Sequence, residues 1–272
     1  MTDSSASRDA AVTDRAILTG SAYRTEQDLA ARQTLYHWQK PRFDLPGIVV
    51  KYLRGVQGSV VDVGCGNGKF IERLNTERPD LKVLGLDVSA GILTGVPRPV
   101  AVADASHLPL PNDSMDAALA LHMLYHVDNI SAAINELGRV VADRGPVIVS
   151  TNSEHDKEEL DQLWARAAGD VLGIEEGPSR ISLSARFALE RAPALLGEVF
   201  SEVEVIELPG VIAVTEPGPV VAHMASYRAW SSQHDVPFGE TIQRAHEIVA
   251  GRIEKYGKFE INCLGGILVC RR

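Results

Sequence analysis

The stretch VVDVGCGNGKF at residues 60–70 decides the fold. It begins as a β-branched apolar run typical of a buried strand, and it leads into the helical pattern GKFIERLNTE. Gly64, Gly66 and Gly68 lie where the strand ends and the helix begins. Glycines at such a turn let the backbone bend sharply and approach a ligand closely, and the helix N-terminus adds amide donors. The stretch therefore predicts a ligand-binding turn, although a tight turn without a ligand would need the same glycines.

Strand and helix patterns alternate on the C-terminal side of this turn. The expected strands after the first are LKVLGLD (81–87), PVAVAD (99–104), MDAALALHML (115–124), PVIVSTN (146–152), VEVIEL (203–208) and FEINCLGGILVC (259–270). Such alternation implies right-handed crossovers and a parallel sheet. We therefore expect an α/β fold with a Rossmann-like, doubly wound, mainly parallel seven-stranded sheet and helices on both faces.

An acid follows the turn at a distance that suits a nucleoside. Asp87 lies nineteen residues after Gly68, at the end of the next expected strand. A carboxylate in that place can accept both hydroxyls of a ribose. The alternative is that Asp87 only caps the following helix.

The glycine spacing does not fit a dinucleotide. The dinucleotide fingerprint needs a third glycine where this chain has Lys69, so NAD and FAD are disfavoured. The spacing Gly-x-Gly-x-Gly, preceded by Asp62, resembles motif I of the class I S-adenosylmethionine-dependent methyltransferases. That resemblance implies S-adenosyl-L-methionine as the cofactor.

Further motifs extend the resemblance from about Val60 to Asn152. Asp104 and Ala105 stand where the family places residues beside the adenine. They are followed by a segment similar to the family's LPF-x-D-x-x-FD, which ends at Asp116. The next helix matches the family's E-x-x-RVL-KPGG pattern at Glu136, Arg139, Val140 and Gly145, with Pro146 in place of the second glycine. The run LHMLYHV and the segment before residue 37 are similar to a bacterial small-molecule branch, the type 11-like methyltransferases.

The resemblance implies a set of residues that contact the cofactor. They are Asp62, Gly64, Cys65, Gly66, Gly68, Asp87, Val88, Asp104, Ala105, His122 and Tyr23. Asp62 is compatible with two roles, holding the loop's amides or accepting from the cofactor's ammonium group. For Asp104, ordinary turn chemistry at a strand end is the alternative.

His122 and His126 are four residues apart, a spacing that could hold a metal on one helix face. No HExxH glutamate accompanies them, so we expect no metal site. His122 falls at the carboxyl end of a strand, where it would contact the methionine part of the cofactor. His126 is the candidate catalytic base, because its ordinary pKa lies near neutrality. A packed or exposed histidine is the alternative.

Composition excludes several classes of protein. With 272 residues, 45% hydrophobic and 23% charged, the chain is typical of a globular protein. The formal charge of −9 disfavours nucleic acid and anionic membranes as partners. Cys65, Cys263 and Cys270 form no C-x-x-C pair. The first residues lack a signal-peptide pattern, so a cytoplasmic location is expected.

The rest of the chain divides by pattern into a tail, a lid and insertions. We expect a flexible tail at 1–22, an N-terminal helical lid at 23–55, and a methyltransferase domain at 56–272. Helical insertions at about 153–200 and 209–258 follow the fifth and sixth strands. In the second insertion, Met224, Tyr227 and Trp230 are spaced by three, which favours core packing over a substrate-pocket wall.

The function that this pattern favours is methyl transfer from S-adenosylmethionine to an O, N or C nucleophile of a small molecule. The insertions would cover the acceptor. A peptide or RNA acceptor, or a non-catalytic cofactor-binding subunit, would use the same cofactor motifs. Alignment of donor and acceptor needs a shape rather than a short motif, so the acceptor and the oligomeric state cannot be predicted.

Overall fold

The computed structural model describes residues 10–233 and 236–272. These residues fall into two compact units. The unit that we call the sheet unit consists of Phe43–Glu154, Leu183–Leu208 and Gly265–Arg272. The helical unit consists of the described residues in the ranges 10–42, 155–182 and 209–264. Residues 23–42 of the expected lid and parts of both expected insertions therefore belong to one compact unit, while residues 43–55 of the expected lid belong to the sheet unit.

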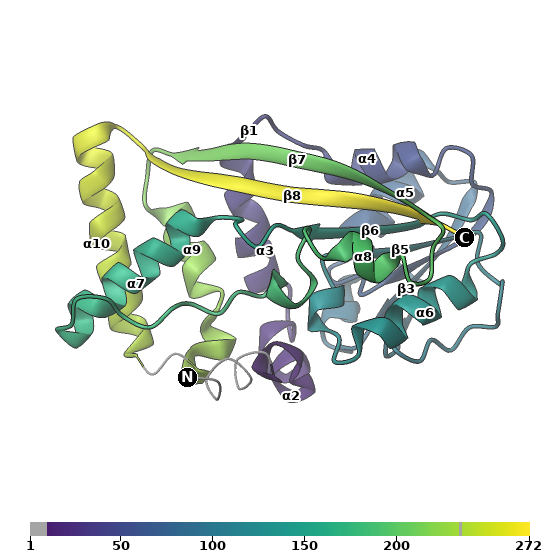
Figure 1. Ribbon diagram of the computed structural model, residues 1–272, viewed down its shortest axis with the longest axis horizontal. Helices are drawn as coiled ribbons and strands as arrows, with labels where there is room; N and C mark the ends of the chain where they lie inside the picture. The colour runs from purple at the N-terminus through teal and green to yellow at the C-terminus, as the bar shows by residue number, and fades with distance from the viewer. Residues whose placement is uncertain (1–9, 234–235) are drawn as a thin grey trace. The chain divides into compact units, whose positions relative to one another are not determined.

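The sheet is the α/β sheet that the sequence predicts, with one more strand. Its strands are β1 (Gln39–Lys40), β2 (Gly58–Val63), β3 (Leu81–Asp87), β4 (Val100–Val102), β5 (Ala117–Leu121), β6 (Val147–Asn152), β7 (Glu202–Val214) and β8 (Phe259–Arg271) (Figure 1). Their order is β1-β7-β8-β6-β5-β2-β3-β4. β6, β5, β2, β3 and β4 pair in parallel, and β8 pairs antiparallel to β6. The eighth strand, β1, has only two residues, too few to show an alternating pattern in the sequence.

The parallel register brings the ends of the strands to one edge. Val63 pairs with Leu86, Asp87 pairs with Val102, and Leu121 pairs with Ser150. The residues that follow β2, β3, β4 and β5 therefore share the carboxyl edge of the sheet, the edge where open α/β sheets bind ligands.

Helices cover both faces of the sheet unit, with α4 and α5 on one face and α6 on the other (Figure 1). The helices and 3-10 turns of this unit are α4 (Leu45–Tyr52), α5 (Lys69–Glu77), η3 (Ile92–Gly95), η4 (Leu124–His126), α6 (Ile130–Val140), η5 (Ser184–Phe187) and α8 (Ala192–Leu196). Because both faces are covered, every residue of β5 is buried. This explains why β5 is a continuous apolar run.

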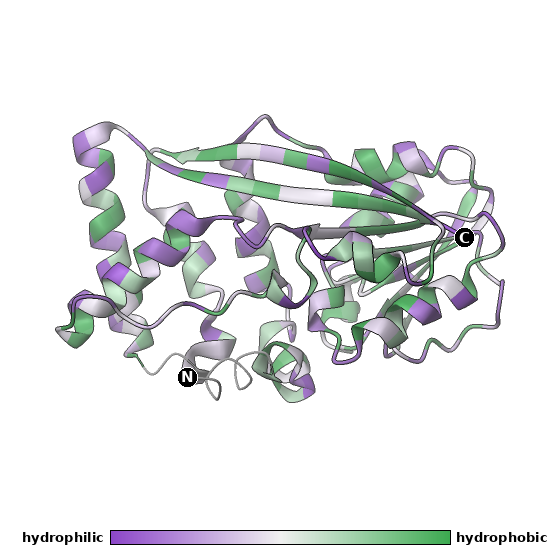
Figure 2. Cartoon of the chain, in the orientation of Figure 1, coloured by the Kyte–Doolittle hydropathy of each residue, from purple (hydrophilic) through white to green (hydrophobic). Residues whose placement is uncertain are grey.

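The helical unit has a separate hydrophobic core. Its elements are α2 (Arg15–Ile17), the π-helical turn η1 (Leu18–Ala22), α3 (Gln27–Thr34), η2 (Leu35–Trp38), α7 (Glu158–Leu172), α9 (Gly218–Ala225), η6 (Arg228–Gln233) and α10 (Phe238–Tyr256). Hydrophobic and hydrophilic residues alternate along α7 and α10 (Figure 2), and Leu163, Trp164 and Val249 are buried in the core. Met224 and Trp230 are also buried, in agreement with the core interpretation of that stripe. In the part of the chain that the structure describes, no helix is long and apolar enough to cross a membrane.

The N-terminal segment differs from the expected tail and lid. Residues 1–9 lie outside the described residues, and residues 10–22 are helical, with Ala11, Val12 and Leu18 buried. The indole nitrogen of Trp230 donates to the carbonyl of Ala11 at 3.0 Å. The first part of the expected helical lid consists of the eight-residue α3, a 3-10 turn and the strand β1. These differences arise because the N-terminal segment is buried against residues far along the chain. The local sequence pattern does not show such contacts.

An ion pair on α6 holds the loop that leads to β5. The Arg139 guanidinium donates to Glu136 at 2.6 Å and to the carbonyls of Leu110 at 2.8 Å and Leu108 at 3.1 Å. The Glu136 carboxylate accepts the Leu108 amide at 2.7 Å. Hydrogen bonding to Arg139 lowers the pKa of Glu136. The matched E-x-x-R pattern therefore fastens a loop in this chain.

Replacing Arg139 with methionine is expected to lower the free energy of unfolding by about 2 kcal/mol, because it leaves two loop carbonyls and the Glu136 carboxylate without their donor. Urea unfolding followed by circular dichroism measures this change. Lys82→Met removes an exposed cation of the same unit and is the control, with no change expected. Equal midpoints for the two variants would contradict the proposed role of Arg139.

Candidate functional site

The glycine turn at the end of β2 adopts left-handed backbone angles, which favour glycine. The φ angles of Gly64, Gly66 and Gly68 are 70°, 54° and 76°. A Cβ on Gly64 would lie 2.7 Å from the Cβ of Met123, and one on Gly68 would lie 2.7 Å from a methyl of Val96. Both the left-handed angles and the close packing exclude a side chain here. The turn is thus held tightly between neighbouring segments.

Asp87 fastens the turn from the end of β3. One carboxylate oxygen accepts the Gly66 amide at 2.9 Å, and the other accepts the Ser89 amide at 2.9 Å. Burial raises the pKa of Asp87, and these amides lower it. The Gly64 and Cys65 amides donate to the Leu86 carbonyl. Asp87 is half-buried, so its remaining lone pairs can accept from a ligand.

Asp62 lies under the turn with an unpartnered oxygen. Its side chain is 1% exposed, and in the described chain its Oδ2 has no hydrogen-bond partner. Burial and the charge of Asp87 raise the pKa of Asp62 to about 8. The sequence left two roles open for Asp62. The first, holding the amides of the loop, is not supported at Gly66, because the Gly66 amide donates to Asp87. A buried carboxylate of this kind favours a cationic partner.

Cys65, Val88, Asp104 and Ala105 lie at the same edge. Cys65 is buried, and burial together with Asp62 and Asp87 raises the pKa of its thiol, which keeps the thiol protonated. Val88 follows Asp87 directly and is half-buried. Asp104 follows β4, and its carboxylate accepts the Ser106 amide at 2.9 Å, which is the turn geometry weighed from the sequence. Ala105 is buried.

His122 and His126 do not lie on one helix. The idea that they form an i, i+4 pair on one helix face, which could hold a metal, is therefore wrong. His122 follows β5 with a φ of 54°, and its amide donates to the Ser150 carbonyl at 3.0 Å. His126 lies in the 3-10 turn η4, with its ring edge-on to Tyr125 at 4.7 Å between centroids. Left-handed backbone at a histidine is uncommon and recurs at functional sites. No group of three metal-ligating side chains occurs among the described residues.

Tyr23 belongs to the helical unit, apart from the residues above. It follows η1 and is half-buried, and its ring centroid lies 5.1 Å from the guanidinium carbon of Arg32.

Sequence reasoning missed two residues at the carboxyl edge of the sheet. Met123 packs against Gly64. Ser150 is buried, and its hydroxyl has no hydrogen-bond partner in the described chain. The sequence places Met123 inside the expected strand 115–124, and no local signal indicates its contact with Gly64.

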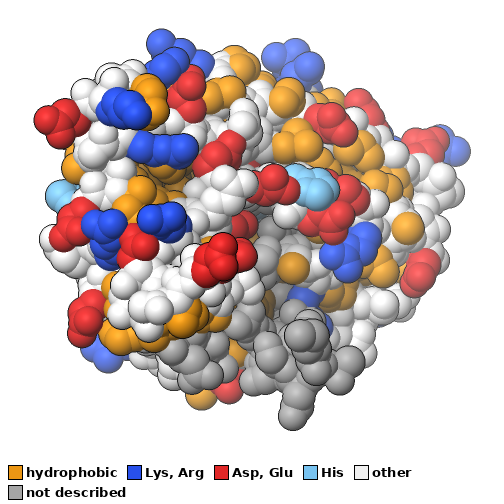
Figure 3. Space-filling view, turned by 60° about the vertical axis from the view of Figure 1, so that its left-hand side comes forward, with side chains coloured by type: hydrophobic (Ala, Val, Ile, Leu, Met, Phe, Trp, Pro, Cys, Tyr) orange, Lys and Arg blue, Asp and Glu red, His pale blue; other side chains and the backbone are white. Residues whose placement is uncertain are grey.

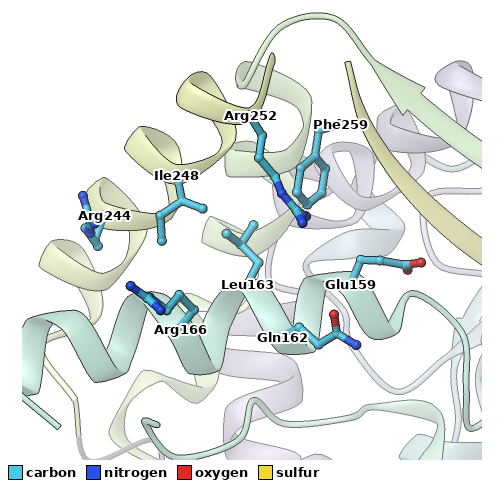
Figure 4. Close-up of a pocket in the computed structure, with 8 residues that line it drawn as sticks. All are labelled: Glu159, Gln162, Leu163, Arg166, Arg244, Ile248, Arg252 and Phe259. Atoms are coloured by element: carbon cyan, nitrogen blue, oxygen red, sulfur yellow. The ribbon is translucent and has the colours of Figure 1, made fainter. Parts of the chain in front are cut away.

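A separate hollow of about 340 Å³ lies between α7 and α10 of the helical unit (Figure 4). Leu163, Ile248 and Phe259 form its apolar part. Arg166 and Arg244 at its side both pair with Asp170. Its cations are thus largely neutralised by carboxylates of the chain itself.

Comparison with known proteins assigns the region that forms the carboxyl edge to a family. Residues 61–149 match the family described as a methyltransferase domain. This range contains the glycine turn, Asp87 and Asp104. The match places residues 61–149 in that family, and the Rossmann-like sheet agrees with the fold of the class I S-adenosylmethionine-dependent methyltransferases.

Two curated relatives illustrate the range of this class. A malonyl-acyl-carrier-protein O-methyltransferase from Yersinia pestis is 32% identical over 117 residues, 40% of this chain and 42% of that protein. A tRNA (carboxymethyluridine(34)-5-O)-methyltransferase from Arabidopsis thaliana is 30% identical over 172 residues, 58% of this chain and 42% of that protein. The chain therefore spans about two fifths of the length of these relatives.

Solved structures share the fold. Phosphoethanolamine N-methyltransferase 2 of Haemonchus contortus, in complex with phosphomonomethylethanolamine and S-adenosylhomocysteine, has a TM-score of 0.56 at 14% identity, covering 95% of this chain and 59% of that chain. The YcgJ protein of Bacillus subtilis has a TM-score of 0.51 at 15% identity, covering 84% of this chain and 97% of that chain.

Proposed function

We propose that the chain transfers a methyl group from S-adenosylmethionine to an O, N or C nucleophile of a small molecule. The observation that carries this proposal is the pair of carboxylates around the glycine turn. Asp87 lies where it can accept ribose hydroxyls, and Asp62 presents a buried, unpartnered oxygen suited to an ammonium group. S-adenosylmethionine carries both groups.

The amides of the turn favour this cofactor over a dinucleotide. A pyrophosphate is bound through free backbone amides at a helix N-terminus. Here the amides of Gly64, Cys65, Gly66 and Gly68 already donate to Leu86, Asp87 and Cys65. A sulfonium cofactor has no phosphate and does not need them.

The residues at the edge have separate roles in the proposal. Asp87 and Asp62 hold the two polar ends of the cofactor, with Asp104 and Ala105 beside the adenine and His122, Val88 and Cys65 lining the site. When bound, S-adenosylmethionine supplies an electrophilic methyl group, so the protein mainly aligns the acceptor and excludes water. His126 is proposed to accept a proton from acceptors that must lose one.

A small-molecule acceptor is favoured over RNA by charge. The formal charge is −9, and on the face drawn in Figure 3 acidic and basic side chains are interspersed. RNA-binding surfaces usually gather Lys and Arg on one face. A peptide acceptor and a non-catalytic cofactor-binding role are the other candidate functions.

Calorimetric titration of the full chain with S-adenosylmethionine, S-adenosylhomocysteine and NAD tests the choice of cofactor. We expect binding of both sulfur compounds and none of NAD. Tight NAD binding without a response to the sulfur compounds would overturn the proposal. Mass-spectrometric screening of small-molecule, peptide and RNA acceptors for a methyl gain then tests the acceptor class. Cofactor binding without turnover of any acceptor would favour the non-catalytic role.

A further inference from the structure

The helical unit buries a group of cationic and aromatic side chains that the cofactor site does not use. We call Arg32, Arg180 and His223, grouped around Tyr227, the arginine cluster. Arg32 comes from α3 and His223 from α9, and Arg180 follows α7. Arg32 is 9% and His223 2% exposed, and the Arg180 side chain is 6% exposed. Three separate segments therefore converge to bury these groups.

Both guanidinium groups lie against the same aromatic ring. The guanidinium carbon of Arg180 is 4.7 Å and that of Arg32 is 5.8 Å from the Tyr227 ring centroid. The His223 ring centroid is 5.7 Å from that of Tyr227. Arg32 also lies 5.9 Å from the Trp230 ring. Aromatic faces hold the cations in place. Arg180 also interacts with the hydroxyl of Tyr227, and this contact raises the pKa of Arg180.

Each member of the cluster has a buried nitrogen without a partner in the described chain. These atoms are Nη2 of Arg32, Nη1 of Arg180, and both ring nitrogens of His223. The other terminal nitrogen of Arg32 makes one long bond, to the Ser226 carbonyl at 3.3 Å. A buried donor that stays unpaired costs free energy, and the cost is larger for a charged donor. Unsatisfied donors on three converging side chains indicate a ligand rather than a packing role.

The charge balance of the cluster leaves one positive charge uncompensated. Arg180 pairs with Asp161 at 2.8 Å. In the described residues no carboxylate lies within ion-pair distance of Arg32, and Asp28, one helical turn away, acts on it only at longer range. Burial lowers the pKa of His223 well below its ordinary value, and the charges of Lys157, Arg180 and Arg32 lower it further, so His223 is neutral.

We propose that the arginine cluster binds a carboxylate group of a small molecule. One uncompensated charge matches a monoanion, whereas a phosphate dianion would bring an excess negative charge into a buried place. A carboxylate also accepts in-plane hydrogen bonds from guanidinium groups. Tyr23 is half-buried and packs on the Arg32 guanidinium.

The proposed carboxylate site does not rest on the proposed function. The arginines that line the hollow between α7 and α10 make a useful contrast. Arg166 and Arg244 already pair with Asp170, and Arg244 also pairs with Glu247 at 2.8 Å. Arg32 has no such pair among the described residues, so it can take an external anion more readily than these two arginines.

Thermal unfolding of the full chain in benzoate, benzamide and inorganic phosphate tests the site. Benzamide has the same ring as benzoate without the charge. We expect benzoate at about 10 mM to raise the unfolding temperature and to bind at least about tenfold more tightly than benzamide or phosphate. Equal effects of benzoate and benzamide would overturn the proposal, and stronger binding of phosphate would overturn the assignment to a carboxylate.

Substitutions at Arg32 separate a binding role from a structural one. Arg32→Met keeps the length of the side chain and removes its charge, so without benzoate its unfolding temperature should equal or exceed that of the parent chain. Its benzoate affinity should fall at least about tenfold. Arg32→Lys keeps the charge without the planar fork and should weaken benzoate binding in a chain that stays folded. The control is Lys258→Met, which removes an exposed cation of the same unit.

The outcomes distinguish this proposal from the proposed function. Unchanged benzoate binding in Arg32→Met or Arg32→Lys, or a drop of several degrees in the unfolding temperature of Arg32→Met without benzoate, would assign Arg32 a structural role. Titration of the same samples with S-adenosylhomocysteine reports on the cofactor site alone. Binding of S-adenosylhomocysteine without binding of benzoate would contradict the carboxylate site only. Binding of benzoate without binding of S-adenosylhomocysteine would contradict the proposed function only.

Discussion

Replacing Asp87 with alanine is expected to weaken the binding of S-adenosylhomocysteine by about 100-fold or more. In the proposed complex the carboxylate accepts ribose hydroxyls, and hydrogen bonds to a charged acceptor contribute about 1.5–3 kcal/mol each. Loss of two such bonds amounts to about 3 kcal/mol at least, and every 1.4 kcal/mol is about tenfold in affinity. Isothermal titration calorimetry of the full chain measures the change.

The second part of this expectation concerns the turn itself. Without Asp87 the Gly66 and Ser89 amides lose their acceptor, so the alanine variant should also unfold at a lower temperature. Asp87→Asn keeps a side-chain oxygen for the Gly66 amide and should retain more stability than alanine while still losing affinity. Asp143→Ala, an exposed position of the same unit, is the matched control. Undiminished affinity in Asp87→Ala would remove the ribose contact from the proposal.

The sheet unit could be predicted from the sequence because its signals are local. The apolar run of β2, the three glycines and the acid at the end of β3 lie within 28 residues, from Val60 to Asp87. Parallel pairing then brings neighbouring strand ends together without further information. For the same reason Asp62 and Asp87 could be named before their geometry was known.

The helical unit could be predicted only as a set of helices. Its arginine cluster combines residues 32, 180 and 223, which are separated by more than forty positions at each step. No spacing rule connects such residues, and a buried arginine has no local signature. The helical segment around Ala11 is a similar case. Its composition is typical of a tail, but the Ala11 carbonyl accepts from the indole of Trp230, which lies far along the chain.

The turn that follows β5 could not be predicted from the sequence either. The pattern indicates a strand through Leu124, whereas β5 ends at Leu121 and His122 adopts a left-handed conformation. Placing His126 on the same helix face as His122 assumed a helix where the chain forms a three-residue 3-10 turn. Turns this short depend on the packing of the segments around them, which the sequence of the turn does not specify.

Replacing Asp62 with asparagine is expected to stabilise the free protein at alkaline pH and to weaken cofactor binding. The pKa of Asp62 is about 8 in the folded chain against 3.8 as the ordinary value. Because the folded state binds the extra proton, the contribution of this group to stability is present in full below pH 3.8 and is lost as the pH rises through about 8. The loss is about 1.4 kcal/mol per pH unit within this window. Asparagine does not titrate, so the variant should lack this fall.

Proton counting gives the sharper measurement. An ammonium group placed beside Asp62 favours the carboxylate, so binding of S-adenosylhomocysteine near pH 6.5 should release about one proton from the parent chain and almost none from Asp62→Asn. Titrations in two buffers with different ionisation enthalpies measure this number. The affinity of the parent chain should also rise with pH up to about 8, by as much as about tenfold per unit, and that of the variant should not. Equal proton release in the two proteins would show that Asp62 does not face the ammonium group and would return it to a purely structural role beneath the turn.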